Sequence, residues 1–294
     1  MFISPSQMAS RRVSANPSPL SLLREALAEI SSRQRLIAYL VQADMKKRGS
    51  DTVLGNLWWI LDPLLQMVVY VVFVTILARS SEPDYPLFIF AAILPWKWYS
   101  SVVSDACGSV VGRAGLIRQI AFPKIVLPIA AATAGVVGFA WGLIPLLGLM
   151  LFYPDRISVQ LAWLPVIAIV QYVFSIGTAI LLAAANVFFR DLGNVAGHVL
   201  RLWWFLSPSL YSLATFDSLK EIKDHPILRE IAGLNPFAVL FEAYRAVIYG
   251  DSGGGLPHAP DLLPLAELLV ASLVFIALAS IFFKRVEPDF AKVL

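Results

Sequence analysis

Two long apolar runs, separated by a single charged step, constrain the fold of this chain more than any other feature. The runs cover residues 161–189 and 195–213, and the step between them contains Arg190 and Asp191. With a rise of about 1.5 Å per residue, each run is about long enough to cross the hydrocarbon core of a bilayer as a helix. Ionised side chains are costly in lipid, so the charged step predicts a short loop at one membrane face.

Four further apolar runs, at residues 57–77, 87–111, 126–152 and 262–283, bring the expected number of spans to six. Of the 294 residues, 58% are hydrophobic and 15% are charged. Soluble domains carry about 25% charged residues, so this chain lacks the polar surface to cover a globule in water. Runs of this length without polar alternation are typical of helices and not of barrel strands. The expected fold class is an all-α integral membrane protein.

The distribution of Lys and Arg predicts the orientation of the chain in the membrane. With a cytosolic N-terminus, the cytosolic segments hold 16 of these residues and the outer segments hold six, while Lys97 lies inside a span. Cytosolic loops carry an excess of Lys and Arg, so both termini are expected in the cytosol. The first 18 residues are polar, rich in Ser and Pro and without an apolar core. They predict a disordered tail and not a secretory signal.

Residues 19–56 are expected to form an amphipathic lead-in to a six-helix domain at residues 57–294. Between residues 19 and 41 apolar side chains recur at helical spacing, and Ser18 followed by Pro19 is a typical helix start. Because basic residues follow at positions 46–48, this helix is expected to lie along the inner leaflet. The alternative is a helix that packs on a soluble partner.

A second amphipathic helix is predicted at residues 236–249, with Gly250 as its stop. It reaches only about 21 Å, so it is expected to dip into the outer leaflet and return, together with a shorter helix near residues 218–231. The residues assigned to these exit helices are Asn235, Phe237, Glu242 and Arg245. The last two lie three residues apart and are expected to pair on the polar side. A re-entrant hairpin at the exit of a pathway and an interfacial cap are the two alternatives.

Seven short motifs follow one another along the chain: LGNLWWILDPLL from Leu54, YPLFIFAAILPW from Tyr85, LIRQIAFPKIVLP from Leu116, NVFFRD from Asn186, LSPSLY from Leu206, LNPFAVLFEAYR from Leu234 and EPDFA from Glu287. In this order and spacing, the chain from about Arg33 onward resembles the permease subunits of type-2 ATP-binding-cassette polysaccharide exporters. That family moves O-antigen, capsule, teichoic acid and related lipid-linked glycans across the cytoplasmic membrane. Relatives often carry an Arg-Asp pair before the first span, where this chain has Ala43-Asp44.

The resemblance implies that two copies of the permease enclose a channel and that two separate cytosolic ATPases drive it. The chain has no GxxxxGK[ST] motif, so no P-loop of its own holds nucleotide, and ATP and Mg are expected on the partner subunit. By similarity, residues 113–122 form the coupling helix that receives the movement of the motor. The residues assigned to this contact are Arg113, Leu116, Ile117, Arg118 and Phe122. The alternative is an ordinary cytosolic loop held on anionic lipid.

Aromatic side chains gather toward the ends of the first, second and fifth predicted spans. Trp and Tyr favour membrane interfaces, so an interfacial role suits most of them. The alternative is that a subset lines the channel, where flat rings offer weak and repeated contacts to sugars. The residues assigned to the substrate channel are Tyr70, Phe73, Lys97, Trp203 and Tyr211. Lys97 lies midway along its span and either contacts a lipid diphosphate or snorkels past a kink at Pro95.

Catalysis and metal binding find no support in the sequence. His198, His225 and His258 are spread over both sides in the expected topology, Cys107 is the single cysteine, and HExxH and GxSxG motifs do not occur. The net charge of +3 reflects the positive-inside bias, and nucleic-acid binding is not expected.

The expected function is therefore a non-enzymatic, channel-forming permease for lipid-linked polysaccharide in the bacterial inner membrane. Its expected partners are a second copy of itself, two ATPase subunits, the glycan and membrane lipid. An ATP-driven permease for a drug or lipid is one alternative. A lone proton-coupled carrier is the other, although the paired intramembrane charges and inverted repeats of such carriers are not evident.

Overall fold

The computed structural model describes residues 17–50, 54–77, 82–120, 122–213 and 232–294. Within these ranges the chain forms helices and no strands. In the described part of the chain, five helical segments are long and apolar enough to span a membrane: Trp58–Thr75, Tyr85–Gln119, Val126–Met150, Val159–Phe188 and Leu262–Val293. The prediction of an all-α, multi-pass membrane protein is confirmed, and five of the six predicted spans have a counterpart among these segments.

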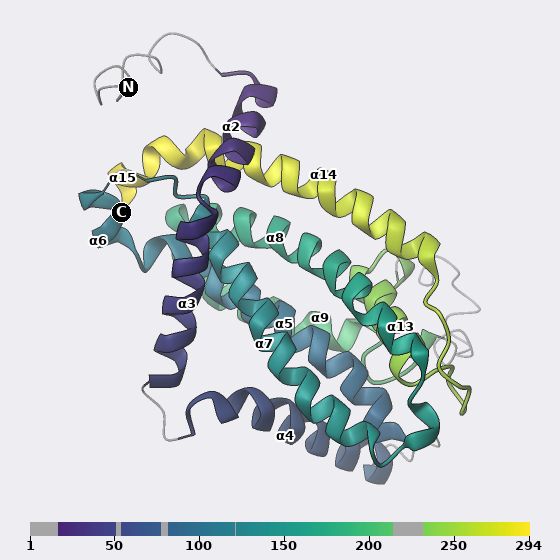
Figure 1. The fold of residues 1–294 in the computed structure, drawn as a ribbon. Helices are drawn as coiled ribbons and strands as arrows, with labels where there is room; N and C mark the ends of the chain where they lie inside the picture. The colour runs from purple at the N-terminus through teal and green to yellow at the C-terminus, as the bar shows by residue number, and fades with distance from the viewer. Residues whose placement is uncertain (1–16, 51–53, 78–81, 121, 214–231) are drawn as a thin grey trace.

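Four long helices form the body of the molecule: α5 (Tyr85–Val111), α7 (Val126–Met150), α8 (Leu164–Phe188) and α14 (Leu262–Val286). Helix α8 packs against α14 and α5, and α5 packs against α7. Figure 1 shows these helices running between the same two ends of the molecule. One end carries the short helix α6 (Ala114–Gln119) and is called the α6 end here. The opposite end carries α13 (Pro236–Ile248) and is called the α13 end.

The first predicted span is helix α4 (Trp58–Val72), which continues as a π-helical turn over Phe73–Leu77. It packs against α5 and α7 and is the least buried of the five spanning segments. Its exposed apolar side chains are Trp58, Leu65, Val68, Val69, Val72 and Phe73. An apolar face of this kind is suited to contact with lipid or with another subunit.

The fifth predicted span, at residues 195–213, differs from the expectation. The helix found there, α9, covers Leu192–Leu206, and its 15 residues reach only about 22 Å against roughly 30 Å of hydrocarbon core. Pro208 explains the early end, because the residue before a proline is disfavoured in the helical region. Ser207 accordingly adopts an extended conformation with ψ 153°. The predicted bounds of this helix are therefore wrong.

The amphipathic helix predicted at residues 19–41 is divided into α2 (Pro19–Ser32) and α3 (Gln34–Ser50), with a break at Arg33. Ser18 caps α2 as predicted, because its hydroxyl oxygen accepts a hydrogen bond from the Ser21 backbone N–H at 3.3 Å. Helix α2 packs on α14, and α3 packs on α7. Both run across the α6 end of the bundle instead of along its axis (Figure 1).

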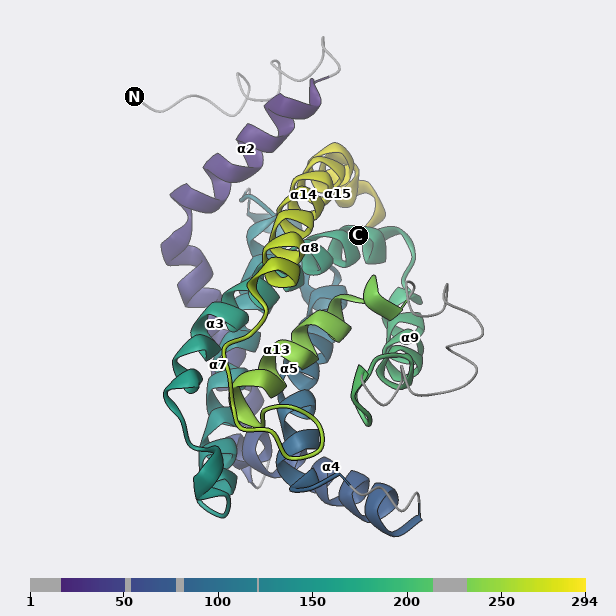
Figure 2. The same ribbon diagram turned by 90° about the vertical axis from the view of Figure 1, so that its right-hand side faces the viewer.

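The helix predicted at residues 236–249 is α13, which lies in front of α5 in Figure 2 and packs against α5, α8 and α14. Asn235 caps it, with Oδ1 accepting from the Phe237 N–H at 3.0 Å. Gly250 stops it in the left-handed region at φ 101°, where glycine is favoured. The shorter helix predicted at residues 218–231, and nearly all of the predicted N-terminal tail, lie outside the described residues.

Short helices join or close the long ones. At the α13 end, η3 (Pro154–Arg156) and η4 (Val159–Trp163) connect α7 to α8. At the other end, η1 (Gly55–Leu57) precedes α4, while η5 (Glu287–Asp289) and α15 (Phe290–Val293) follow α14. These turns place α15 beside α6 at one end of the bundle (Figure 1).

Candidate functional site

Helix α6 forms the first candidate site, a surface at the end of the bundle. Its inner side is anchored by Ile117, which is 8% exposed and lies in a buried cluster that also contains Leu40 and Phe290. Leu116 and Ile120 face outward, with 38% and 55% of their surface exposed. A short helix with an anchored inner side and an exposed apolar outer side is suited to contact with another protein.

Salt bridges and hydrogen bonds brace α6 from two directions. The Arg113 Nη2 lies 2.6 Å from Asp44 Oδ1 of α3. Position 43, where relatives often carry an arginine, is alanine in this chain, so the arginine that pairs with Asp44 comes from the start of α6 instead. The Arg118 guanidinium donates to the backbone oxygen of Leu294, and the Arg190 Nη2 donates to that of Val293 at 3.3 Å. The last helix thus ties α6 to the loop before α9.

The five residues assigned to this surface therefore take different positions. Leu116 and Arg118 are exposed, whereas Ile117 is buried and Phe122 packs against the same inner cluster. Ile120, which the sequence analysis did not single out, contributes the most exposed apolar side chain of α6.

Lys284 organises a buried charge cluster that sequence reasoning missed. Its side chain is 2% exposed, and its Nζ lies 3.1 Å from Glu25, 2.9 Å from Glu29 and 2.7 Å from Glu287. Burial raises the pKa of the Glu29 carboxyl above its ordinary value, although the hydrogen bond and the charge of Lys284 oppose the shift. Glu287 also accepts a hydrogen bond from the Lys124 backbone N–H at 3.1 Å. The cluster joins α2, α14 and the start of α7. Glu287, the first residue of the EPDFA motif, is the one member of the cluster that a sequence motif had pointed to.

A second candidate site is a cluster of aromatic rings between α4, α5, α9 and α13. Trp96 lies at its centre, with ring centroids 4.7 Å from Phe237, 5.4 Å from Trp204 and 6.0 Å from Trp203. Tyr70 stacks on Trp204 at 5.6 Å. The structure thus brings together Tyr70 and Trp203, which the sequence analysis assigned to a channel from separate spans.

The other residues assigned to the channel lie elsewhere. Phe73 is 50% exposed on the outer face of α4. Lys97 forms an ion pair with Asp62 in a separate cavity between α4, α5 and α7. Tyr211 is partly buried and contributes its backbone oxygen to the contact with Arg245 described below.

Asn235 joins the aromatic cluster to α13. Besides capping that helix, its Oδ1 accepts from the Trp203 indole N–H at 3.1 Å, and its Nδ2 donates to Ser207 Oγ at 2.8 Å. One side chain therefore fixes the start of α13 against the end of α9, which is where α9 stops short of a full span.

Arg245 requires a correction, because it was expected on the polar side of α13 and is 2% exposed. Its Nη1 donates to the backbone oxygens of Pro208 at 2.7 Å and Tyr211 at 3.1 Å, and its Nη2 donates to that of Ser209. The guanidinium also lies 3.8 Å above the Phe88 ring. The predicted pairing with Glu242 is present at 3.7 Å. Arg245 thus caps the irregular turn after α9, whose carbonyls lack helical partners.

Arg156 plays a comparable part at the α13 end, and the sequence analysis counted it only as a loop charge. It is 5% exposed and lies 3.0 Å from Asp84 Oδ2, and it donates to the backbone oxygens of Tyr249 at 2.7 Å and Gly255. Three segments distant in sequence meet at this one guanidinium. Among the described residues, no group of three His, Cys, Asp or Glu side chains is arranged to hold a metal ion.

Comparison with known proteins places the chain in a family. The sequence profile of the ABC-2 type transporter family matches residues 35–249. The chain is 32% identical over 264 residues to the O-antigen export system permease protein RfbA of Myxococcus xanthus, a match that covers 90% of this chain and 97% of that protein. Two Klebsiella pneumoniae proteins of the same name are 29% and 30% identical, each over 60% of this chain and 69% of its own length. The chain therefore belongs to the ABC-2 type transporter family.

Proposed function

We propose that this chain is the channel-forming membrane subunit of an ATP-driven exporter of lipid-linked polysaccharide. The observation that carries the proposal is the match over nearly the whole chain to an O-antigen export system permease. Five potential spans and an exposed docking helix at one end suit a permease that a separate motor drives. ATP and Mg would be held by the partner subunits, so this chain acts by conformational change and not as an enzyme.

The proposed orientation places the α6 end in the cytosol and the α13 end outside, in the bacterial inner membrane. The positive-inside bias supports this orientation, because Arg113 caps α6, Arg118 lies within it, and Arg190 donates to the same C-terminal segment as Arg118. In this orientation α2 and α3 lie crosswise at the cytosolic face, as interface helices do. Helix α13 enters the outer leaflet without crossing it, because its 13 residues are too few to span.

Two copies of the chain would enclose the pathway, with α4 and α9 of one copy facing α4 and α9 of the other across it. These helices are neighbours, since Tyr70 of α4 stacks on Trp204 of α9. Both also carry exposed apolar faces, which on α9 comprise Val195, Val199, Leu202, Phe205 and Leu206. A helix too short to span needs protein around its end, because lipid offers no partner for irregular backbone. A second copy supplies that cover.

The aromatic cluster then forms part of the wall of the pathway. Tyr70, Phe73, Trp203 and Tyr211 are the proposed contacts to the moving glycan, and weak contacts to flat rings suit a polymer that must keep moving. Helix α6 is the proposed coupling helix, which receives the motion of the ATPase through Leu116, Arg118 and Ile120.

The proposal is tested by deleting the gene for this chain and by purifying the tagged chain from its native membrane. We expect lipid-linked polysaccharide to accumulate in the cytoplasm of the deletion strain, and an ATP-binding-cassette ATPase to co-purify with the tagged chain. An unchanged amount of surface glycan in the deletion strain would contradict the proposal. Accumulation of a lipid or drug without accumulation of glycan would instead support a permease for such compounds.

A further inference from the structure

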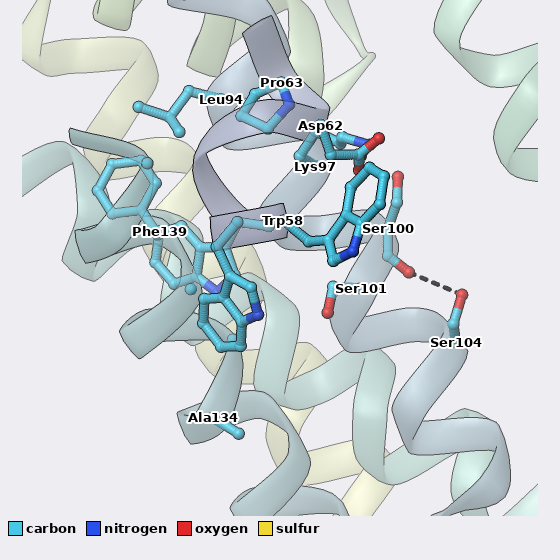
Figure 3. A pocket seen from close by; sticks show the side chains of 15 residues that line it. Trp58, Asp62, Pro63, Leu94, Lys97, Ser100, Ser101, Ser104, Ala134 and Phe139 are labelled. Carbon is cyan, nitrogen blue, oxygen red and sulfur yellow. Dashed lines mark hydrogen bonds and ion pairs between the residues drawn. The ribbon is translucent and has the colours of Figure 1, made fainter. Parts of the chain in front are cut away.

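A cavity of about 530 Å³ lies in the side of the bundle between α4, α5 and α7 (Figure 3). Small-molecule sites usually measure roughly 300–1,000 Å³, so the cavity is large enough for a ligand. It is separate from the aromatic cluster, since Trp96, Trp203 and Trp204 do not line it. The pathway proposed above uses none of its residues.

Aromatic side chains form much of the lining, namely Trp58, Trp59, Trp98 and Phe139. Two glycines of α7 hold the indoles in place. A Cβ at Gly135 would lie 2.8 Å from Trp98 Cδ1, and a Cβ at Gly138 would lie 2.8 Å from the Trp59 ring. The rings therefore lie directly against helix backbone, where close packing limits their movement.

Two buried polar groups in the lining have no hydrogen-bond partner among the described residues. They are the indole N–H of Trp98, whose side chain is 3% exposed, and the hydroxyl of Ser100. Both side chains border the cavity, but these two atoms have less than 1 Å² of accessible surface, so the polar groups that a molecule in the cavity can reach are those of Asp62 and Lys97.

The charge of the cavity limits the kind of molecule that fits. Asp62 and Lys97 are the charged residues of its lining, and they pair with each other, so their charges cancel. A phosphate or another anion would have to compete with Asp62 for Lys97. Hydroxyl groups, by contrast, donate to a carboxylate and accept from an ammonium without disturbing the net charge. Figure 3 shows Ser100, Ser101 and Ser104 along the α5 side, which adds hydroxyl partners.

The combination of flat rings with neutral, mixed donors and acceptors is suited to a sugar ring, which has apolar C–H faces and a rim of hydroxyls. The exposed side chains of Asp62 and Ser104 leave the cavity open to the outside of the bundle. Trp58 begins α4 at the same end at which α3 crosses the bundle (Figure 1). A sugar carried on a membrane lipid would therefore reach the cavity from the side.

We propose that the α4–α5–α7 cavity binds a sugar ring of a lipid-linked glycan, with the rings of Trp58 and Trp59 as its apolar contacts and Asp62 and Lys97 as partners of the hydroxyls. The identification of the glycan rests on the proposed function. The inference adds a binding site within one chain, apart from the pathway between two copies.

The test measures ligand binding to the full chain, reconstituted with its ATPase in lipid nanodiscs, by saturation-transfer NMR. The probes are octyl β-glucoside below its micelle concentration, methyl β-glucoside and octyl phosphate. We expect octyl β-glucoside to bind, methyl β-glucoside to bind more weakly, and octyl phosphate to leave bound octyl β-glucoside in place. Equal displacement by octyl phosphate would assign the site to phospholipid head groups and overturn the proposal. Equal affinity for both glucosides would overturn the assignment to a lipid-borne sugar.

Three variants locate the binding. Ser104→Trp fills the mouth of the cavity from an exposed position and is expected to weaken octyl β-glucoside binding at least tenfold. Trp58→Leu keeps an apolar side chain and removes the flat ring, so a roughly fivefold loss is expected. Leu273→Trp adds the same bulk on the exposed face of α14 and is expected to leave binding unchanged. Wild-type binding by both cavity variants would overturn the proposal.

The outcomes for this site and for the proposed function are distinguishable. A deletion strain that still exports its glycan contradicts the function, whatever the purified chain binds. A chain that restores export but binds no glucoside contradicts only the sugar site.

Discussion

Arg245 is a residue whose role differs between the sequence prediction and the structure. On a helical projection it falls near Glu242 and looks like half of a surface pair. In the structure its guanidinium is buried and holds the backbone carbonyls of the turn after α9. Because Pro208 and Ser209 lie beyond the end of α9, loss of the arginine removes the donor that their buried carbonyls have in the described part of the chain.

We therefore expect Arg245→Met to lower the free energy of unfolding by roughly 3 kcal/mol, since removal of a charged donor from buried acceptors is among the most destabilising changes. Thermal unfolding of the purified chain in detergent measures the effect. Arg201→Met, at an exposed position of α9, serves as the matched control and is expected to unfold like the wild type. Equal unfolding temperatures for the two variants would show that the carbonyl contacts contribute little.

At the scale of the helix, α2 depends on one buried lysine for its position on α14. Lys284 faces Glu25 and Glu29 of α2 and Glu287 beyond the end of α14. Without the lysine, three carboxylates would share a site from which their common buried cation is gone, while Glu287 would keep Lys124, whose Nζ lies 3.8 Å away. Like charges at this distance repel, so the docking of α2 should fail first.

Lys284→Met is expected to increase tryptic cleavage at Arg24 and Arg33, because α2 detaches from α14. Burial raises the pKa of Glu29 in the folded chain above its ordinary value of 4.5, because the protonated carboxyl is easier to bury than the carboxylate. The contribution of Glu29 to the docking of α2 is therefore complete below pH 4.5 and is lost as the pH rises through the folded pKa. The variant lacks the lysine that opposes this shift, so its cleavage rate should rise more steeply with pH than that of the wild type. Lys292→Met, at an exposed pair with Asp289, is the control. A cleavage pattern common to both variants would contradict the role of the cluster.

Neighbouring residues of α6 are expected to have different roles: Leu116 and Ile120 are exposed and would contact the ATPase, whereas Ile117 is buried and stabilises the fold. Leu116→Glu combined with Ile120→Glu places charge on the exposed side of α6 and is expected to reduce export at least tenfold while the chain still inserts. Ile117→Ala instead removes buried volume and should cost about 2–5 kcal/mol of folding stability. Export assays in a deletion strain and thermal unfolding of the purified chain distinguish the two effects.

Gln119→Glu is the control for the double variant, because it adds charge to α6 without removing an apolar side chain, and export by this variant should stay normal. Normal export by the double variant would exclude α6 as the coupling element.

At the scale of the whole molecule, the exposed faces of α4 and α9 indicate an assembly larger than one chain. Val69 is 64% exposed on α4, although that helix is one of the five potential spans. The proposed second copy would cover this face and the end of α9. The single cysteine, Cys107, is buried, which makes the chain convenient for cysteine cross-linking.

In a Cys107→Ala background, Val69→Cys is expected to form a disulfide-linked dimer under mild oxidation in native membranes, because a position next to a two-fold axis lies close to its equivalent in the other copy. A non-reducing gel measures the dimer. Leu273→Cys, at an exposed position of α14 that is expected to face lipid, should remain monomeric. Cross-linking through α14 but not through α4 would place the interface on the opposite face and contradict the proposed pathway.

Several features of this protein follow from sequence alone, because they depend on residues that are neighbours along the chain. Apolar runs located the five spanning helices, since hydrocarbon accepts only continuous apolar helix of sufficient length. The caps Ser18 and Asn235 and the stop at Gly250 were predicted from side chains within a few residues of each helix end. The ordered motifs also identified the family.

Tertiary structure decided where charge is buried and which short helices lie across the bundle. Arg245 reaches a carbonyl 37 residues away, and Lys284 reaches a carboxylate 255 residues away. The break at Arg33 likewise lies between two helices that pack on different partners, α2 on α14 and α3 on α7. Hydrophobic periodicity reports only which side of a helix is apolar, whereas the partner of a buried charge depends on how distant segments meet in space.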